Sequence, residues 1–254
     1  MIRLLVSGLR VHFVQLSRSV SELVAMTVWP IIYATIAYYM FGAESDPDVL
    51  LTASLGATVM AIWSSVAFSS GGAIELQRKL GTLELLVAAP VPFAALLAPI
   101  TIATSAIGVY ALVATLVWGR VLFDIPLHFE HPALFALSLP VAIVAIGMLG
   151  LILASTLVLY RAALFLGASF EYPVWLVTGL LVPLSVLPGW VAPISWVLAP
   201  TWGMRAIRES TVGGAPLRAI GMCLALSVCY AVLAVLCLRV FERLARERAT
   251  LALT

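Results

Sequence analysis

The chain of 254 residues is unusually apolar, because 63% of its residues are hydrophobic and only 10% are charged. A soluble domain of this length needs more polar residues to cover its surface, so the composition excludes a soluble fold and predicts an all-α polytopic membrane protein. The net charge of +2 says little about partners, and no nucleic-acid partner is expected.

Residues 1–20 differ from the rest of the chain in having an amphipathic pattern. Apolar side chains, among them Leu5 and Leu9, fall on one face of a helical wheel, and Arg3, Arg10 and Arg18 fall on another. This pattern predicts a helix that lies along the membrane surface. The alternative is a tilted extension of the first membrane span.

Six later stretches are long and apolar enough to cross a bilayer as helices, which takes roughly 20 residues. These predicted spans are 23–42, 49–70, 91–118, 132–159, 163–183 and 219–238. Only the fifth contains a charged residue. We therefore expect residues 1–254 to form a single transmembrane domain.

The distribution of Lys and Arg predicts the orientation of these spans. With the N-terminus inside, ten of the fourteen basic residues are cytoplasmic. These ten are Arg3, Arg10, Arg18, Arg78, Lys79, Arg161, Arg239, Arg243, Arg246 and Arg248. Both basic termini are then cytoplasmic, which favours six spans over five.

A polar segment, residues 72–89, separates the second and third spans. Its apolar side chains form one narrow helical stripe: Leu76, Leu80, Leu83 and Val87. Its polar side chains lie roughly opposite: Glu75, Arg78, Lys79 and Thr82. The pattern predicts an amphipathic cytoplasmic helix. Periodicity alone equally fits a solvated loop that anchors the positive-inside orientation.

Two polar features lie further along the chain. His128 and His131 flank Glu130, and we expect an ordinary polar turn there, with no metal site. Glu171 lies within the fifth span beside Pro173, and an acid within a membrane is a functional candidate by default. Glu171 is therefore a candidate for the translocation path; the alternative is a hydrated acid near the cytoplasmic boundary.

The outer segment 184–215 is apolar but interrupted by prolines, which break a continuous helix. It also contains Trp190, and tryptophan is favoured at the boundary between membrane and water. We expect short re-entrant helices that dip into the outer leaflet and return.

Two sets of residues form motifs with a fixed order and spacing. The first motif comprises Glu75, Arg78, Gly81, Thr82, Leu83, Glu84, Leu85 and Pro90. The second comprises Pro183, Leu187, Pro188, Trp190, Pro200 and Arg208. Both motifs resemble those of permeases from drug- and polysaccharide-export ABC transporters of bacteria. The order of surface helix, six spans and broken outer segment is also similar, so the resemblance covers nearly the whole chain.

The resemblance implies a multi-pass permease subunit of the bacterial plasma membrane, which pairs with a second permease chain, the same or related. It implies that segment 72–89 is a coupling helix that docks on a cytoplasmic ATPase subunit, through Glu75, Arg78, Lys79, Gly81, Thr82 and Glu84. The chain lacks a GxxxxGK[ST] phosphate loop, so the partner is expected to bind ATP and Mg, with no cofactor in this chain.

The expected function is therefore ATP-driven export of an amphipathic small molecule, a drug or antibiotic, or a lipid-linked cargo. An ATP-independent secondary transporter or channel is the alternative, although it favours charges in several spans or inverted repeats. An intramembrane enzyme is not expected, because no span contains a histidine that could act as a base.

Overall fold

The computed structural model describes residues 2–41, 47–79, 81, 93–124, 129–157, 163–180, 184 and 187–248. The structure of these residues consists of α-helices and their connections, with no β-strand assigned in them, as the composition predicts. The helices are α1 (Ile2–Arg18), α2 (Val20–Phe41), α3 (Pro47–Lys79), α5 (Phe93–Phe123), α6 (Pro132–Leu157), α7 (Ala163–Ser169), α8 (Glu171–Val177), α9 (Val191–Val197), α10 (Ala199–Thr211) and α11 (Pro216–Arg248).

Four described helices are long and apolar enough to cross a membrane. These stretches are Asp48–Ser70, Ala94–Phe123, Pro132–Leu157 and Pro216–Val240. They coincide with the second, third, fourth and sixth predicted spans. Helix α2 lies in the first predicted span, and its described residues include a shorter apolar helix, Thr27–Ile36. The six-span layout stays a prediction.

The fifth predicted span, 163–183, contains two short helices in place of one continuous helix. Helix α7 ends at Ser169 and α8 begins at Glu171. Pro173 explains the break, because its ring would clash with the carbonyl of Ser169 in a continuous helix but fits the first turn of a new one. The break places Glu171 at the first position of α8.

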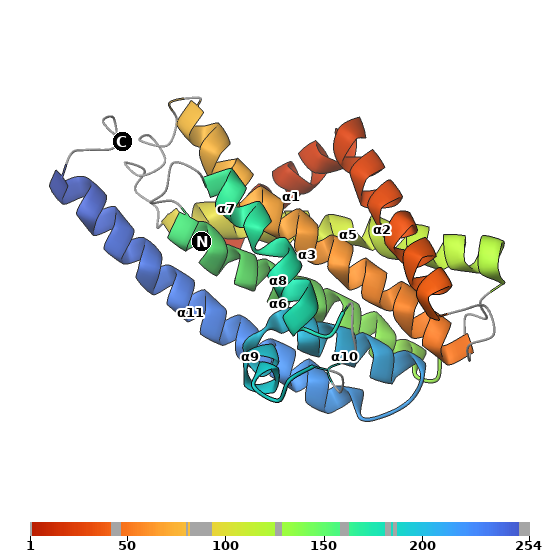
Figure 1. Cartoon of the computed structure of the whole chain (residues 1–254). Coiled ribbons are helices and arrows are strands. Elements are labelled where there is room, and N and C mark those ends of the chain that lie inside the picture. The colour runs from red at the N-terminus through yellow and green to blue at the C-terminus, as the bar shows by residue number, and fades with distance from the viewer. Residues whose placement is uncertain are drawn as a thin grey trace.

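The long helices are arranged around α6. Helix α6 contacts α3, α5, α10 and α11, whereas α3 and α11 lie on different sides of it (Figure 1). Helix α3 also contacts α2, α5, α7, α8 and α10, so it is surrounded by other helices. Helices α9 and α10 pack near one end of α11 (Figure 1).

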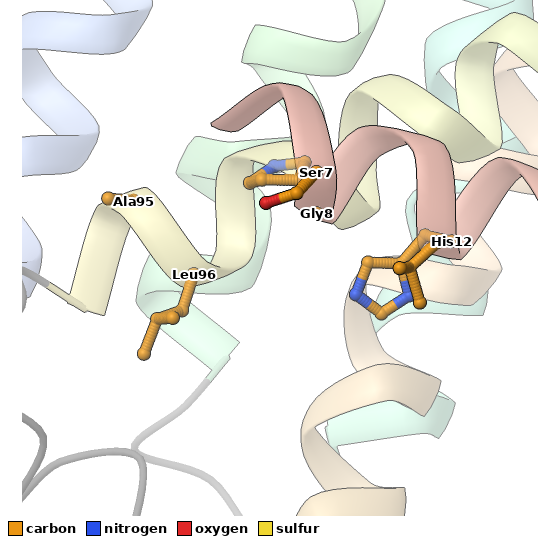
Figure 2. Close-up of a pocket in the computed structure, with 7 residues that line it drawn as sticks. Ser7, Gly8, His12, Ala95 and Leu96 are labelled. Carbon is orange, nitrogen blue, oxygen red and sulfur yellow. The ribbon is translucent and has the colours of Figure 1, made fainter. Parts of the chain in front are cut away.

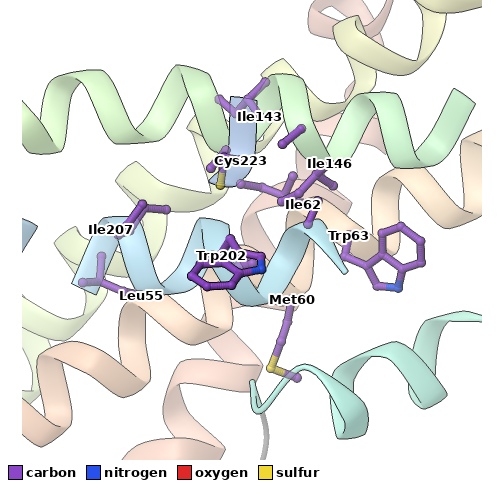
Figure 3. Close-up of a cluster of buried hydrophobic side chains, with 14 of the residues drawn as sticks. Leu55, Met60, Ile62, Trp63, Ile143, Ile146, Trp202, Ile207 and Cys223 are labelled. Atoms are coloured by element: carbon purple, nitrogen blue, oxygen red, sulfur yellow. The ribbon is translucent and has the colours of Figure 1, made fainter. Parts of the chain in front are cut away.

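The largest cluster of buried side chains joins α3, α6, α10 and α11 (Figure 3). Trp202 of α10 is the largest of its fully buried side chains. Close approach of α6 to α3 depends on Gly150, since a Cβ at that position would clash with the side chain of Val66. The Ser70 hydroxyl of α3 lies 3.1 Å from the carbonyl oxygen of Gly150 and joins the same two helices.

Candidate functional site

The charged segment predicted to couple to a partner begins as the end of α3. The helix runs without interruption from Pro47 to Lys79, so Glu75, Arg78 and Lys79 lie on a continuation of the second span. We had expected the span to end near residue 70, before a separate helix at 72–89. Thr82 and Glu84 lie outside the described residues, so the coupling helix itself stays a prediction.

Gly81 lies just beyond the end of α3 and has a positive φ of 66°. Glycine at this position is a common way to end a helix, because it adopts the left-handed conformation without steric penalty. A Cβ at Gly81 would meet no described atom within 4 Å. Within the described chain, the residue is therefore explained by backbone conformation and not by close packing.

The N-terminal helix α1 packs against α5, as Figure 2 shows. Gly8 of α1 lies against Pro99 of α5. Beside this contact is a cavity of about 270 Å³, and its lining also includes Ser7, Val11, His12, Ala95 and Leu96. Burial lowers the pKa of His12 from its ordinary value of 6.5, which favours the neutral ring. The contact connects α1 to the start of α5.

The structure describes the side chains of two of the three basic residues predicted for α1. Arg10 and Arg18 are exposed. The helix contains Arg3 as predicted from the sequence pattern, but that side chain lies outside the described part of the chain. The position of α1 relative to a membrane surface stays a prediction.

The outer segment forms two helices separated by Leu198, whose backbone is extended. Pro200 is buried at the start of α10, where its fixed φ suits the first turn. Pro188 and Trp190 are exposed ahead of α9, and Arg208 is exposed on α10. The four predicted residues are therefore spread along the segment and do not form one site.

Hydrogen bonds hold α9, α10 and α11 together. The Trp202 indole N–H donates to the carbonyl oxygen of Trp196 at 2.8 Å, and the Tyr230 hydroxyl donates to the carbonyl oxygen of Val197. The Arg205 guanidinium lies 5.2 Å from the centre of the Trp202 ring. These contacts give the segment a defined packing on α11.

The turn before α6 is bonded to the end of α10. The backbone N–H groups of Glu130 and His131 donate to the carbonyl oxygens of Thr211 and Ser210, each at 3.0 Å. These bonds satisfy carbonyls that a helix end leaves without partners. The polar turn expected at this position thus caps a neighbouring helix, while His128 lies outside the described residues.

Glu171 lies beside a cluster of aromatic rings from α2 and α8. The rings of Tyr33 and Trp175 meet edge to face at 5.2 Å, and so do those of Tyr172 and Trp175. Trp29 stacks on Tyr33 at 6.1 Å. Glu171 is close enough to Tyr33 for the two groups to interact electrostatically.

Sequence reasoning singled out Glu171 but missed the aromatic cluster around it. The available signal was spacing, since Trp29 and Tyr33 are four residues apart on a helix and Tyr172 and Trp175 are three apart. The pairing of these two sets depends on the packing of α2 near α8, which the sequence does not state.

Residues 54–212 match the family model described as ABC-2 type transporter. The match runs from α3 to the end of α10 and covers more than half of the chain. The chain belongs to the ABC-2 type transporter family. No curated protein matches the sequence closely enough to add a more specific relationship.

Membership identifies this ABC-2 protein as a transmembrane subunit of an ABC transporter, in agreement with the resemblance noted in the sequence. It is a multi-pass membrane protein that works with an ATPase subunit. The matched region includes Glu75–Gly81, Glu171 and the α9–α10 segment, but the match assigns no role to any of these residues.

Proposed function

We propose that this ABC-2 permease is the transmembrane subunit of an ATP-driven exporter in the bacterial plasma membrane. Its cargo is an amphipathic small molecule, a drug or antibiotic, or a lipid-linked compound. A cytoplasmic ATPase subunit binds ATP and Mg, and this chain is not itself an enzyme. A second permease chain, the same or related, completes the transporter, with the termini of both chains in the cytoplasm.

The continuity of α3 is the observation that best supports this proposal. One helix extends from the buried core to the charged residues Glu75, Arg78 and Lys79. A hydrogen-bonded helix is stiff along its axis, so a force applied at its charged end would displace the part that packs against α5, α6 and α10. The helix continues through Gly71 and Gly72, so the motion would be transmitted across these two glycines.

Charged residues at the end of α3 provide the chemistry for docking. Ion pairs and hydrogen bonds to Glu75, Arg78 and Lys79 would orient the ATPase. ATP-driven closure of the ATPase dimer would then move α3 and change access to the cargo path. Helix α1, bound to the start of α5, would contact the ATPase beside this segment.

A reconstitution experiment tests the proposal. The permease is co-expressed with the ATPase subunit of the same transporter, purified and placed in lipid vesicles. The wild-type pair should form a stable complex and move an amphipathic cargo only when ATP is supplied. Movement that needs an ion gradient, and no ATPase subunit, would instead support a secondary transporter.

Charge reversal tests the coupling segment separately. The double variant Arg78→Glu with Lys79→Glu should weaken association with the ATPase on the order of ten-fold or more. Arg218→Glu, an exposed arginine at the start of α11, is the matched control and should leave association unchanged. Equal association of the double variant and the control would show that the ATPase docks elsewhere.

A further inference from the structure

The aromatic cluster around Glu171 has both buried and accessible rings. Trp175 is only 4% exposed and packs edge-on against Tyr33 and Tyr172. Trp29 and Tyr172 are 54% and 63% exposed, so much of each side chain lies on the surface of this chain. The buried ring fixes the positions of the others, and the exposed rings remain available to a ligand.

Glu171 has no opposite charge nearby in the sequence or in the described structure. It is the only charged residue between residues 162 and 204, and the apolar part of α2 from Leu23 to Phe41 contains none. The ion pairs Arg120–Asp124 and Arg205–Glu209 in the described part of the chain do not involve Glu171. A carboxylate in an apolar part of a membrane protein is costly without a counter-charge.

The local backbone also favours a ligand site. Glu171 begins α8 directly after the break imposed by Pro173, which places the carboxylate one residue before Tyr172 and four before Trp175. The indole N–H of Trp175 is buried and has no hydrogen-bond acceptor among the described residues.

We propose that Trp29, Tyr33, Glu171, Tyr172 and Trp175 form a recognition site for the cationic group of an amphipathic cargo. The positive centre lies over the faces of the exposed rings, which attract cations through their quadrupoles, and next to the Glu171 carboxylate. The apolar body of the cargo contacts the surrounding side chains. This inference rests on the proposed export function and narrows its cargo to organic cations.

The proposed chemistry distinguishes between ligands that differ only in charge. Aromatic rings alone would accept any flat or bulky apolar group, whereas aromatic rings with a carboxylate favour a cation and reject an anion. Tetraphenylphosphonium and tetraphenylborate are suitable probes, since they have nearly the same size and shape and opposite charges.

Binding of the two probes is measured on the full-length permease with its ATPase in lipid nanodiscs, without ATP, and empty nanodiscs correct for partition into lipid. We expect saturable binding of tetraphenylphosphonium and none of tetraphenylborate. Glu171→Gln keeps the shape of the side chain and should weaken binding of the cation on the order of ten-fold. Tyr172→Ala should weaken it several-fold.

Two matched variants control for the loss of a carboxylate or an aromatic ring elsewhere. Glu130→Gln, in the turn before α6, and Trp190→Ala, at an exposed position before α9, should bind the cation as the wild type does. The wild-type comparison of the two probes needs no variant, so the proposal can be judged even if a substitution prevents folding.

Equal binding of both probes, or unchanged cation binding by Glu171→Gln, would overturn the proposal. That result would leave Glu171 with a structural role, such as an interaction with Tyr33. The ATPase association measured on the same nanodiscs separates this failure from that of the export function: an intact complex with no cation preference refutes only the cargo class. A permease that binds no ATPase refutes the export function itself.

Discussion

Helices α3 and α11 have the same length of 33 residues but opposite surroundings. In α3, 78% of the most apolar stretch is buried inside the molecule, compared with 28% in α11. The buried helix is nevertheless the less apolar one, with a mean hydropathy of 1.7 against 2.5. In a soluble protein the order would be reversed, since exposed surfaces there face water.

The difference shows that this molecule is built with lipid as its solvent. Lipid tails are as apolar as leucine, so an exposed helix in a bilayer is apolar all round and gains little by packing. A buried helix is instead held by close contact and by hydrogen bonds between helices. Helix α3 has both, through the approach of Gly150 to Val66 and through the Ser70 hydroxyl.

The comparison predicts that leucines of the two helices differ most in their contribution to stability. Leu55 of α3 is fully buried, and Leu55→Ala should lower the free energy of unfolding by about 2–5 kcal/mol because it leaves a cavity. Leu224 of α11 is 49% exposed, and Leu224→Ala should have a much smaller effect. Thermal unfolding of the two variants in detergent gives the difference; similar losses would mean that α11 is also packed, against a partner chain.

Substitution of glycine by alanine should change the stability of the fold differently in α6, where Gly150 faces α3, and in α11, where Gly221 lies at an open position. Gly150→Ala should destabilise the fold by about 1–3 kcal/mol, because the added methyl forces Val66 and α6 apart. Gly221 of α11 has no neighbour within 4 Å of an added Cβ. Gly221→Ala should therefore leave stability unchanged or raise it by up to about 1 kcal/mol, as alanine favours a helix.

The same thermal measurement tests this pair of glycines. If Gly150→Ala were neutral, α3 and α6 would be farther apart than the structure places them. A loss of stability in Gly221→Ala would point to a partner that covers α11 in the membrane.

The smallest difference in stability between α3 and α11 is expected for substitution of a serine. The Ser70 hydroxyl lies 2.6 Å from the carbonyl oxygen of Val66 in its own helix and 3.1 Å from that of Gly150 in α6. Ser70→Ala should cost about 0.6 kcal/mol, typical of a bond between membrane helices. Among the described residues, the Ser227 hydroxyl of α11 donates to the carbonyl oxygen of Cys223 in the same helix, at 2.7 Å.

Ser227→Ala is therefore the matched control, with a smaller expected change. Combining Ser70→Ala with Gly150→Ala should give less than the sum of the two effects, because both changes act on one contact. Additive effects would indicate that the Ser70 hydroxyl stabilises α3 only locally.

The apolar stretches predicted four of the described helices well, with ends that differ by a few residues at most positions. The clearest exceptions have local causes. Helix α3 continues through Gly71 and Gly72 to Lys79 and ends just before Gly81, whose φ is positive. Helix α11 likewise continues to Arg248, ten residues beyond the predicted end of the sixth span. The fifth span is broken at Phe170, and Pro173, which we had noted beside Glu171, accounts for the break.

Prediction of the candidate sites was less complete for a physical reason. Glu171 was evident because a lone charge in an apolar run contrasts with its neighbours along the chain. Trp29 and Tyr33 were not, since aromatic residues are ordinary in a membrane helix and become distinctive only beside Trp175 of another helix. The coupling residues rest on the resemblance, and Thr82 and Glu84 lie outside the described structure.

By itself, the sequence determined that this protein is helical, spans a membrane and has a charged segment after its second span. Those properties depend on composition and on spacing within single segments, because each helix satisfies its own backbone hydrogen bonds in lipid. Only the tertiary structure decided that α3 is buried while α11 is exposed, and which rings lie beside Glu171. Both depend on contacts between segments far apart in the chain. An apolar helix surface can face lipid or another helix equally well, so its sequence does not indicate which of the two it contacts.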